Sequence, residues 1–134
     1  MLDLRHNQVC QILAIWCRRL GASVVLEPTS LDNRNQNRPD LHVILGHQTY
    51  LVDVSIVHPT APSNVVQAAR PLNTAKKREQ AKIRQYSSMS RQQNAIFVPF
   101  VLETFGGFGK RAVRFLKDIA QFADGVMDWD RTEI

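Results

Sequence analysis

Two neighbouring apolar runs, each associated with an aspartate, constrain the fold of this chain more than any other feature. Leu41–Leu45 and Tyr50–Val57 are rich in Val, Ile and Leu, and Gly46-His47-Gln48 between them predicts the turn of a β-hairpin. Asp40 stands at the start of the first run, and Asp53 lies inside the second. Burying an unpaired carboxylate is costly, so acids in such positions need a metal ion or a charged partner.

The pairing of this hairpin decides where the two carboxylates lie. Side chains alternate along a strand, so Asp53 shares its face with Ser55. A register centred on the turn brings Asp40 and Asp53 together at the open end, where a divalent cation such as Mg²⁺ would relieve their repulsion. The alternative is that Asp40 caps a turn while Asp53 forms a buried salt bridge, and composition alone favours neither. By parity His42 shares the face of Asp40, and a non-catalytic role is favoured for it.

The rest of the pattern predicts a single α/β domain. Apolar residues recur at helical spacing over Leu4–Leu20, and Gly21 is well placed to end that helix. The other expected elements are a strand over Ala22–Leu26, a helix from Asn73 or Thr74 to about Ser88, a strand over Ala95–Leu102 and a helix ending near Ala123. The order is therefore α-β-β-β-α-β-α, with the domain over residues 1–123 and an acidic C-terminal tail over residues 124–134.

The charge of the chain is concentrated on the predicted second helix. The formal net charge is +5, and seven basic residues face one acid between Arg70 and Arg91, which favours an anionic partner. The predicted nucleic-acid contacts are Lys76, Lys77, Arg78, Arg84, Tyr86 and Arg91. Contacts of the basic side chains with backbone phosphates would raise affinity without reading sequence. The alternative is a solvated helix face.

The two cysteines, Cys10 and Cys17, lie seven residues apart in the first predicted helix. Two helical turns separate their Cα atoms by roughly 10 Å, too far for a disulfide. We expect small core residues of a reduced, intracellular protein. The stripe of His6, Cys10 and Cys17 also permits a zinc half-site, although its spacing matches no usual pattern. No apolar run approaches the length of a membrane span, so no membrane partner is expected.

Four segments of the chain carry a resemblance to a known nuclease family. They are Leu26-Glu27-Pro28, Arg38-Pro39-Asp40, the run from Val52 to Pro59 (VDVSIVHP) and the run from Phe97 to Gly106 (FVPFVLETFG). Together they resemble the core of PD-(D/E)XK nucleases and, more narrowly, the restriction-like endonuclease domain of non-LTR retrotransposons. The resemblance covers most of the chain and implies an αβββαβ core with a four-stranded mixed sheet flanked by helices.

The resemblance also implies roles for individual residues. Asp40 and Asp53 would hold Mg²⁺ or Mn²⁺, with Glu27 as a supporting acid or merely the start of a loop. In the commonest pattern a catalytic lysine follows the second acid by two residues, and here that position is Ser55. In the retrotransposon branch the lysine lies on the next helix, four residues before a tyrosine, which points to Lys82. A solvated surface lysine is the alternative interpretation of Lys82, and Lys76 and Lys77 are then the reserve candidates for the catalytic lysine.

The implied function is that of a Mg²⁺-dependent DNA endonuclease that nicks target DNA for primed reverse transcription. Its partners would be DNA, a reverse transcriptase domain of a longer polyprotein and a second copy of the chain as dimer partner, with the nucleus as the site of action. The main alternative is a catalytically inactive nucleic-acid-binding module of the same fold, which Ser55 keeps open. A scaffold domain that binds protein through the acidic C-terminus is the third interpretation.

Overall fold

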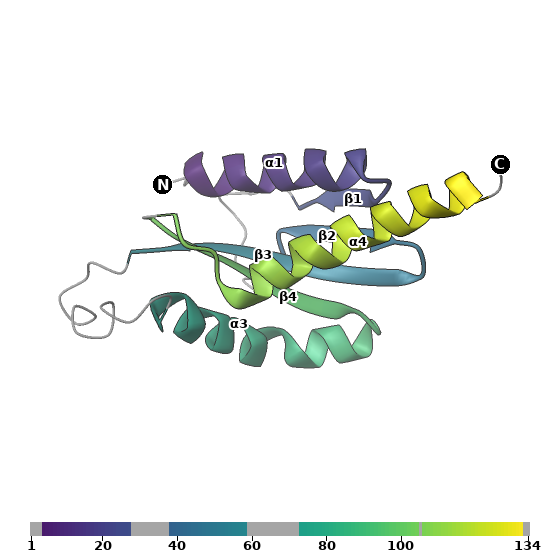
Figure 1. Cartoon of the computed structure of the whole chain (residues 1–134). Helices are drawn as coiled ribbons and strands as arrows, with labels where there is room; N and C mark the ends of the chain where they lie inside the picture. Colours follow the sequence, from purple (N-terminus) through teal and green to yellow (C-terminus); the bar gives the residue numbers. More distant parts are fainter. Residues whose placement is uncertain (1–3, 28–37, 59–72, 105, 133–134) are drawn as a thin grey trace.

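A four-stranded mixed sheet lies between two helical layers. The computed structural model of the chain describes residues 4–27, 38–58, 73–104 and 106–132. Its elements are α1 (Leu4–Arg19), β1 (Ser23–Leu26), β2 (Leu41–Leu45), β3 (Gln48–Val57), α3 (Asn73–Gln92), β4 (Ile96–Glu103) and α4 (Lys110–Thr132). Helices α1 and α4 cover one face of the sheet and α3 covers the other (Figure 1). The predicted α/β class and element order are confirmed.

The strand order is β1-β2-β3-β4, so each strand is paired with its neighbour in the chain. The pairs β1–β2 and β2–β3 are antiparallel, and β3–β4 is parallel. A parallel pair requires a crossover connection, and α3 lies within it. The hairpin register aligns Leu41 with Val52 and Leu45 with Gln48, which leaves a two-residue turn. Gly46 adopts a φ of 61° in that turn, a conformation that glycine takes without steric penalty.

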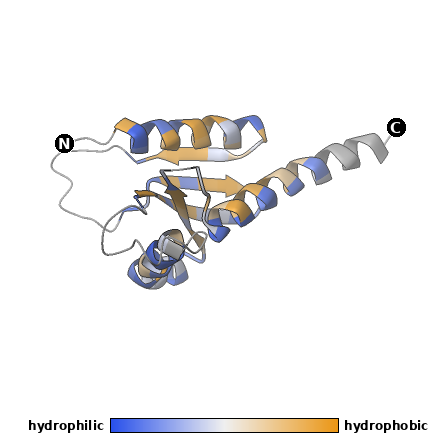
Figure 2. Cartoon of the chain, turned by 60° about the vertical axis from the view of Figure 1, so that its left-hand side comes forward, coloured by the Kyte–Doolittle hydropathy of each residue, from blue (hydrophilic) through white to orange (hydrophobic). Residues whose placement is uncertain are grey.

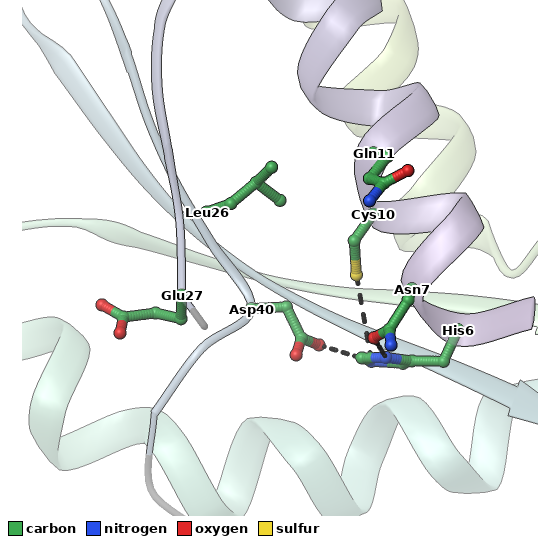
Figure 3. A pocket seen from close by; sticks show the side chains of 7 residues that line it. All are labelled: His6, Asn7, Cys10, Gln11, Leu26, Glu27 and Asp40. Carbon is green, nitrogen blue, oxygen red and sulfur yellow. Dashed lines mark hydrogen bonds and ion pairs between the residues drawn. The ribbon is translucent and has the colours of Figure 1, made fainter. Parts of the chain in front are cut away.

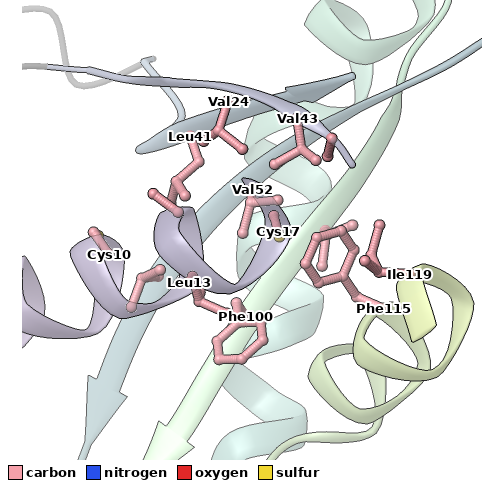
Figure 4. Packing of buried hydrophobic residues seen from close by; sticks show 14 of the residues in the cluster. Cys10, Leu13, Cys17, Val24, Leu41, Val43, Val52, Phe100, Phe115 and Ile119 are labelled. Carbon is pink, nitrogen blue, oxygen red and sulfur yellow. The ribbon is translucent and has the colours of Figure 1, made fainter. Parts of the chain in front are cut away.

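The main core lies between the sheet and the layer formed by α1 and α4. Its buried residues come from all four strands and both helices, and Figure 4 shows Leu13 and Cys17 of α1, Val52 of β3 and Phe115 of α4 converging there. Figure 2 shows the strands as predominantly hydrophobic, whereas α3 is mostly hydrophilic. Both cysteines are free and buried, as the sequence predicts.

Three helix ends differ in how well the sequence predicts them. α1 ends at Arg19, and Gly21 follows with a φ of 100°, as expected of a glycine that stops a helix. α3 continues to Gln92, beyond the expected end near Ser88, and Asn94 follows it with a φ of 51°. α4 continues to Thr132, so the backbone of the segment expected to be an acidic tail is helical through that residue. None of the described helices has the length and apolar character needed to cross a membrane.

Candidate active site

Asp40 lies immediately before β2, at the open end of the hairpin. The hairpin register pairs Leu41 with Val52, so the next positions outward are Asp40 and Asp53. The backbone N–H of Val54 donates a hydrogen bond of 2.7 Å to Asp40 Oδ2, and the N–H of Glu27 donates one of 2.9 Å to the Asp40 carbonyl. The side chain of Asp40 thus continues the β2–β3 ladder beyond the last backbone pair, which fixes its position at the strand edge.

Asp53 occupies the middle of β3 and is only 5% exposed. The Lys82 ammonium of α3 lies 3.0 Å from Asp53 Oδ2, and the contact is ionic rather than a well-aligned hydrogen bond. The pKa of Asp53 is raised to about 6, because burial and then the negative charge of Asp40 raise it, while Lys82 opposes both effects. The structure therefore brings together the three residues Asp40, Asp53 and Lys82, from three separate segments of the chain.

Tyr86 fixes the turn of α3 that carries Lys82. The two residues are four apart, and Lys82 Nζ lies 6.0 Å from the centre of the Tyr86 ring. Tyr86 stacks on Phe97 of β4 with ring centres 4.7 Å apart, and its hydroxyl donates a hydrogen bond of 3.4 Å to the Arg38 carbonyl. Burial raises the pKa of Tyr86, with further contributions from the charges of Asp53 and Asp40.

The burial of Tyr86 corrects one expectation from the sequence. Its side chain, expected among the nucleic-acid contacts, is 1% exposed and packs inside the domain. By contrast Lys76, Lys77, Arg78, Arg84 and Arg91 are all exposed along α3. The structure gives Tyr86 a packing role, because its ring fills the space between α3 and β4.

On its other side Asp40 contacts α1. His6 Nε2 lies 3.0 Å from Asp40 Oδ2, and Cys10 Sγ lies 3.9 Å from the same His6 nitrogen (Figure 3). The hydrogen bond to the Asp40 carboxylate is the largest cause that raises the pKa of His6 to about 11. A pocket of about 220 Å³ opens beside these residues and is lined by His6, Asn7, Cys10, Gln11, Leu26, Glu27 and Asp40.

Glu27, the expected supporting acid, lies at the edge of this pocket. Its carboxylate points away from Asp40 in Figure 3, and Glu27 Oε1 lies 3.6 Å from His42 Nε2. Ser55 is 7% exposed, and the ammonium of Lys82 comes from α3 to the face of β3 that Ser55 shares with Asp53. The ammonium at this face thus comes from α3 and not from the strand position of Ser55.

The sequence did not predict two features around this site. The first is the contact of Asp40 with His6, which depends on how α1 docks on the sheet. The stripe of His6 and Cys10 was visible in the sequence, but the third residue considered with them was Cys17, and both cysteines were expected in the core. Cys17 is fully buried in the main core. The second is Glu79, a 6% exposed acid on the basic helix α3, which accepts a hydrogen bond of 2.8 Å from the N–H of Arg111 at the start of α4.

The donor set fits a hard divalent cation. Asp53 Oδ2 is a buried carboxylate oxygen whose contact with Lys82 is ionic, and Asp40 is the adjacent acid whose charge raises the Asp53 pKa. Carboxylate oxygens are the ligands that Mg²⁺ prefers, and a cation between the two acids would offset their repulsion.

Comparison with known proteins relates the chain to a mobile element. It is 33% identical over 118 residues to the retrotransposable element SLACS 132 kDa protein of Trypanosoma brucei gambiense, a match that covers 81% of this chain. The chain spans only 10% of the length of that relative. No protein-family model matches the chain.

Among solved structures, a Holliday junction resolvase, Hjc of Archaeoglobus fulgidus, matches with a TM-score of 0.46 and 9% sequence identity, over 75% of this chain and 70% of that chain. The sequence match shows that the chain is related to a segment of a retrotransposon protein, and its motifs resemble those of the restriction-like endonuclease domain of non-LTR retrotransposons.

Proposed function

We propose that this chain is a metal-dependent endodeoxyribonuclease domain that nicks target DNA for retrotransposon insertion. The observation that carries the proposal is the convergence of Asp40, Asp53 and Lys82. The Lys82 ammonium lies 3.0 Å from the buried carboxylate of Asp53, and Asp40 is the cross-strand neighbour of Asp53. Perturbed acids of this kind concentrate at functional sites. The sequence relation to a retrotransposon protein supports the biological setting.

Asp40 and Asp53 would hold Mg²⁺ or Mn²⁺ through their carboxylates. Glu27 lines the pocket next to Asp40 and would assist only by turning from His42 toward it. When bound, the cation would lower the pKa of a water ligand and stabilise charge on the scissile phosphate.

Lys82 would act on the same reacting group from the α3 side. Its ammonium is positioned by the charge of Asp53 and by the buried ring of Tyr86 one helical turn away. From there it can orient the attacking water and neutralise charge that develops on the phosphate. Ser55 is too short to reach that position, so Lys82 takes over the role of the lysine missing from the strand.

The DNA backbone would lie along the exposed side of α3. A pocket of about 420 Å³ at the end of β3 is lined in part by His58, Lys77 and Arg78, which offers cationic and imidazole donors for a phosphate. On this proposal the chain works in the nucleus, within a longer polyprotein that supplies the reverse transcriptase, and sequence specificity comes from other domains or from a dimer partner.

Plasmid nicking tests the proposal directly. We expect the wild-type chain to convert supercoiled plasmid to open circles with Mg²⁺ or Mn²⁺ and not with EDTA. Asp53→Asn and Lys82→Met should each lose at least about 10²-fold in rate, in line with the loss of an electrostatic or acid–base contribution. Lys117→Met is the matched control, because it removes an exposed lysine from α4 and leaves the α3 side of the sheet intact. Equal nicking by wild type and Asp53→Asn would overturn the proposal.

The inactive binding module makes a different prediction for the same protein. It would bind duplex DNA without cleaving it and without any response to EDTA. In both cases the affinity should fall with salt, and Lys76→Ala should reduce the slope of log K against log salt by about 1. Fluorescence anisotropy with a labelled duplex measures this slope. An unchanged slope in Lys76→Ala and Arg78→Ala would exclude the exposed side of α3 as the binding face.

A further inference from the structure

A second group of metal-binding side chains lies on the α1 side of Asp40. His6 and Cys10 are four residues apart, which places them on one face of α1. His6 Nε2, Cys10 Sγ and an Asp40 carboxylate oxygen all lie within 4.8 Å of one another. Cys10 is buried, and the side chains of His6 and Asp40 are 21% and 17% exposed. The three groups come from α1 and from the residue just before β2, and the hydrophobic core holds α1 and β2 together.

The distances within this cluster lie close to those of a coordination polyhedron. Zinc lies about 2.3 Å from sulfur and about 2.0 to 2.2 Å from nitrogen or oxygen, so ligand atoms at tetrahedral corners are roughly 3.3 to 3.6 Å apart. Here His6 Nε2 lies 3.0 Å from Asp40 Oδ2 and 3.9 Å from Cys10 Sγ, values on either side of that range. A cation would therefore need shifts of only about half an ångström in these two separations.

The backbone around the cluster is held in place before any cation binds. Asp40 Oδ2 already accepts the Val54 N–H at 2.7 Å, which orients the carboxylate. The pocket of about 220 Å³ beside the three groups is lined in part by the polar residues Asn7 and Gln11, and leaves room for water as a fourth ligand. Three protein ligands plus water is the arrangement of an open zinc site.

We propose that His6, Cys10 and Asp40 form a cation site of their own, selective for a thiophilic divalent ion of the zinc class. The donor set decides the selectivity: thiolate and imidazole favour zinc and cobalt, whereas the all-oxygen set of Asp40 and Asp53 favours magnesium. Binding displaces one proton from the Cys10 thiol and one from the His6 imidazolium. The resulting thiolate and imidazole, together with the Asp40 carboxylate, carry two negative charges, so a divalent ion leaves the cluster neutral. The two sites meet at Asp40, which offers an oxygen to either.

Cobalt titration of the full chain tests the site without DNA or magnesium, so it succeeds or fails independently of the nuclease proposal. A cobalt–thiolate bond gives a charge-transfer absorption in the near ultraviolet, and tetrahedral Co²⁺ gives visible bands. We expect both signals to saturate at one equivalent of Co²⁺ and to vanish on addition of Zn²⁺. Only Cys10 and Cys17 can supply a thiolate, because the chain has 2 cysteines.

The variants then identify the ligands. Cys10→Ser should abolish the charge-transfer band, while Cys17→Ala should keep it, since among the described residues the thiol that lies with His6 and Asp40 is that of Cys10. His6→Gln, at a partly exposed position, should weaken cobalt binding at least about tenfold and serves if Cys10→Ser fails to fold. A band that persists in Cys10→Ser, or a wild-type protein that binds cobalt with no band, would overturn the proposal.

Discussion

At the scale of single residues, Asp40 and Asp53 show how two neighbouring carboxylates acquire different surroundings. Asp40 sits at a strand end, where a backbone N–H at 2.7 Å and the His6 ring at 3.0 Å contact the same oxygen. Asp53 sits within a strand, where burial and the charge of Asp40 both raise its pKa and Lys82 only partly compensates. The ionised form of Asp53 therefore destabilises the folded chain, and a cation that binds there gains affinity by neutralising this charge.

This cost predicts how stability depends on pH. The pKa of Asp53 is raised from 3.8 to about 6 in the folded state, so the folded chain holds this proton more tightly than the unfolded chain. The contribution of Asp53 to stability is then greatest below about pH 4 and is lost as pH rises to about 6. The loss is at most about 3 kcal/mol, from roughly two pKa units at 1.36 kcal/mol each.

Urea denaturation between pH 4 and pH 7, without divalent ions, measures this effect. Asp53→Asn removes the titrating group. As pH rises through this range, the unfolding free energy of the wild type should therefore fall relative to that of the variant. Other acids titrate in both proteins and cancel in the difference. A difference that stays constant with pH would show that the Asp53 pKa is not raised.

At the scale of elements, α3 shows why an apolar pattern was an incomplete guide to the site. The sequence predicts a thin apolar stripe of Ala75, Ile83, Tyr86 and Met89; Ile83 and Met89 are half-buried, and Ala75 and Tyr86 are buried. Between them the sheet-facing side of α3 also contains Glu79 and Lys82, which a hydrophobicity pattern assigns to solvent. Glu79 is buried because it accepts the N–H of Arg111, and Lys82 is largely covered because it pairs with Asp53. Such partners are brought together by tertiary packing and leave no periodic signal.

The strands were easier to predict from the sequence than the charged contacts between elements. β2 has the predicted bounds, because an apolar run between Asp40 and the Gly46 turn has defined ends. The hairpin register and the approach of Asp40 to Asp53 follow from that turn, since alternation fixes each face. The resemblance to a nuclease family, rather than any periodicity, singled out Lys82. Where α1 would place His6 could not be foreseen, since helix docking depends on side-chain packing.

The buried Glu79 predicts a coupling between α3 and α4. Its carboxylate satisfies a backbone N–H at the start of α4, and a Cβ on Gly109 would lie 2.6 Å from Glu79 Oε2. Glu79→Ala should lower the unfolding free energy by about 1–3 kcal/mol, because the Arg111 N–H loses a charged acceptor. Gln80→Ala, an exposed neighbour, should change it by less than about 0.5 kcal/mol.

Denaturant unfolding of these variants measures both values. Gly109→Ala should also destabilise the chain, because the added methyl group displaces the Glu79 carboxylate from the helix start. If Glu79→Ala costs no more than Gln80→Ala, the contact contributes little to stability and the two helices dock through their apolar faces alone.

At the scale of the whole molecule, side chains from both helical layers contact the pair of acids at the open end of the hairpin. α1 reaches Asp40 through His6 from one face, and α3 reaches the adjacent Asp53 through Lys82 from the other. The long β3 strand connects the two, since its Val54 N–H binds Asp40 while its Asp53 side chain faces α3. The fold thus places a soft donor pair and a hard donor on opposite sides of one shared carboxylate.

This shared carboxylate predicts that the two proposed cations compete. If zinc binds His6, Cys10 and Asp40, the acid pair loses one of its charges to that ion, so the affinity of the chain for magnesium should fall. One equivalent of Zn²⁺ should then lower the rate of Mg²⁺-supported plasmid nicking by about tenfold or more. Changes to the groups that contact a metal ligand typically reduce metal affinity or activity by this factor. Cys10→Ser should nick at the wild-type rate without zinc and resist this inhibition, because its serine is a poor zinc ligand. The measurement is the nicking rate at fixed Mg²⁺ with increasing Zn²⁺, for both proteins. Equal inhibition of wild type and Cys10→Ser would mean that zinc acts directly at Asp53 or on the DNA, and that Asp40 does not link the two sites.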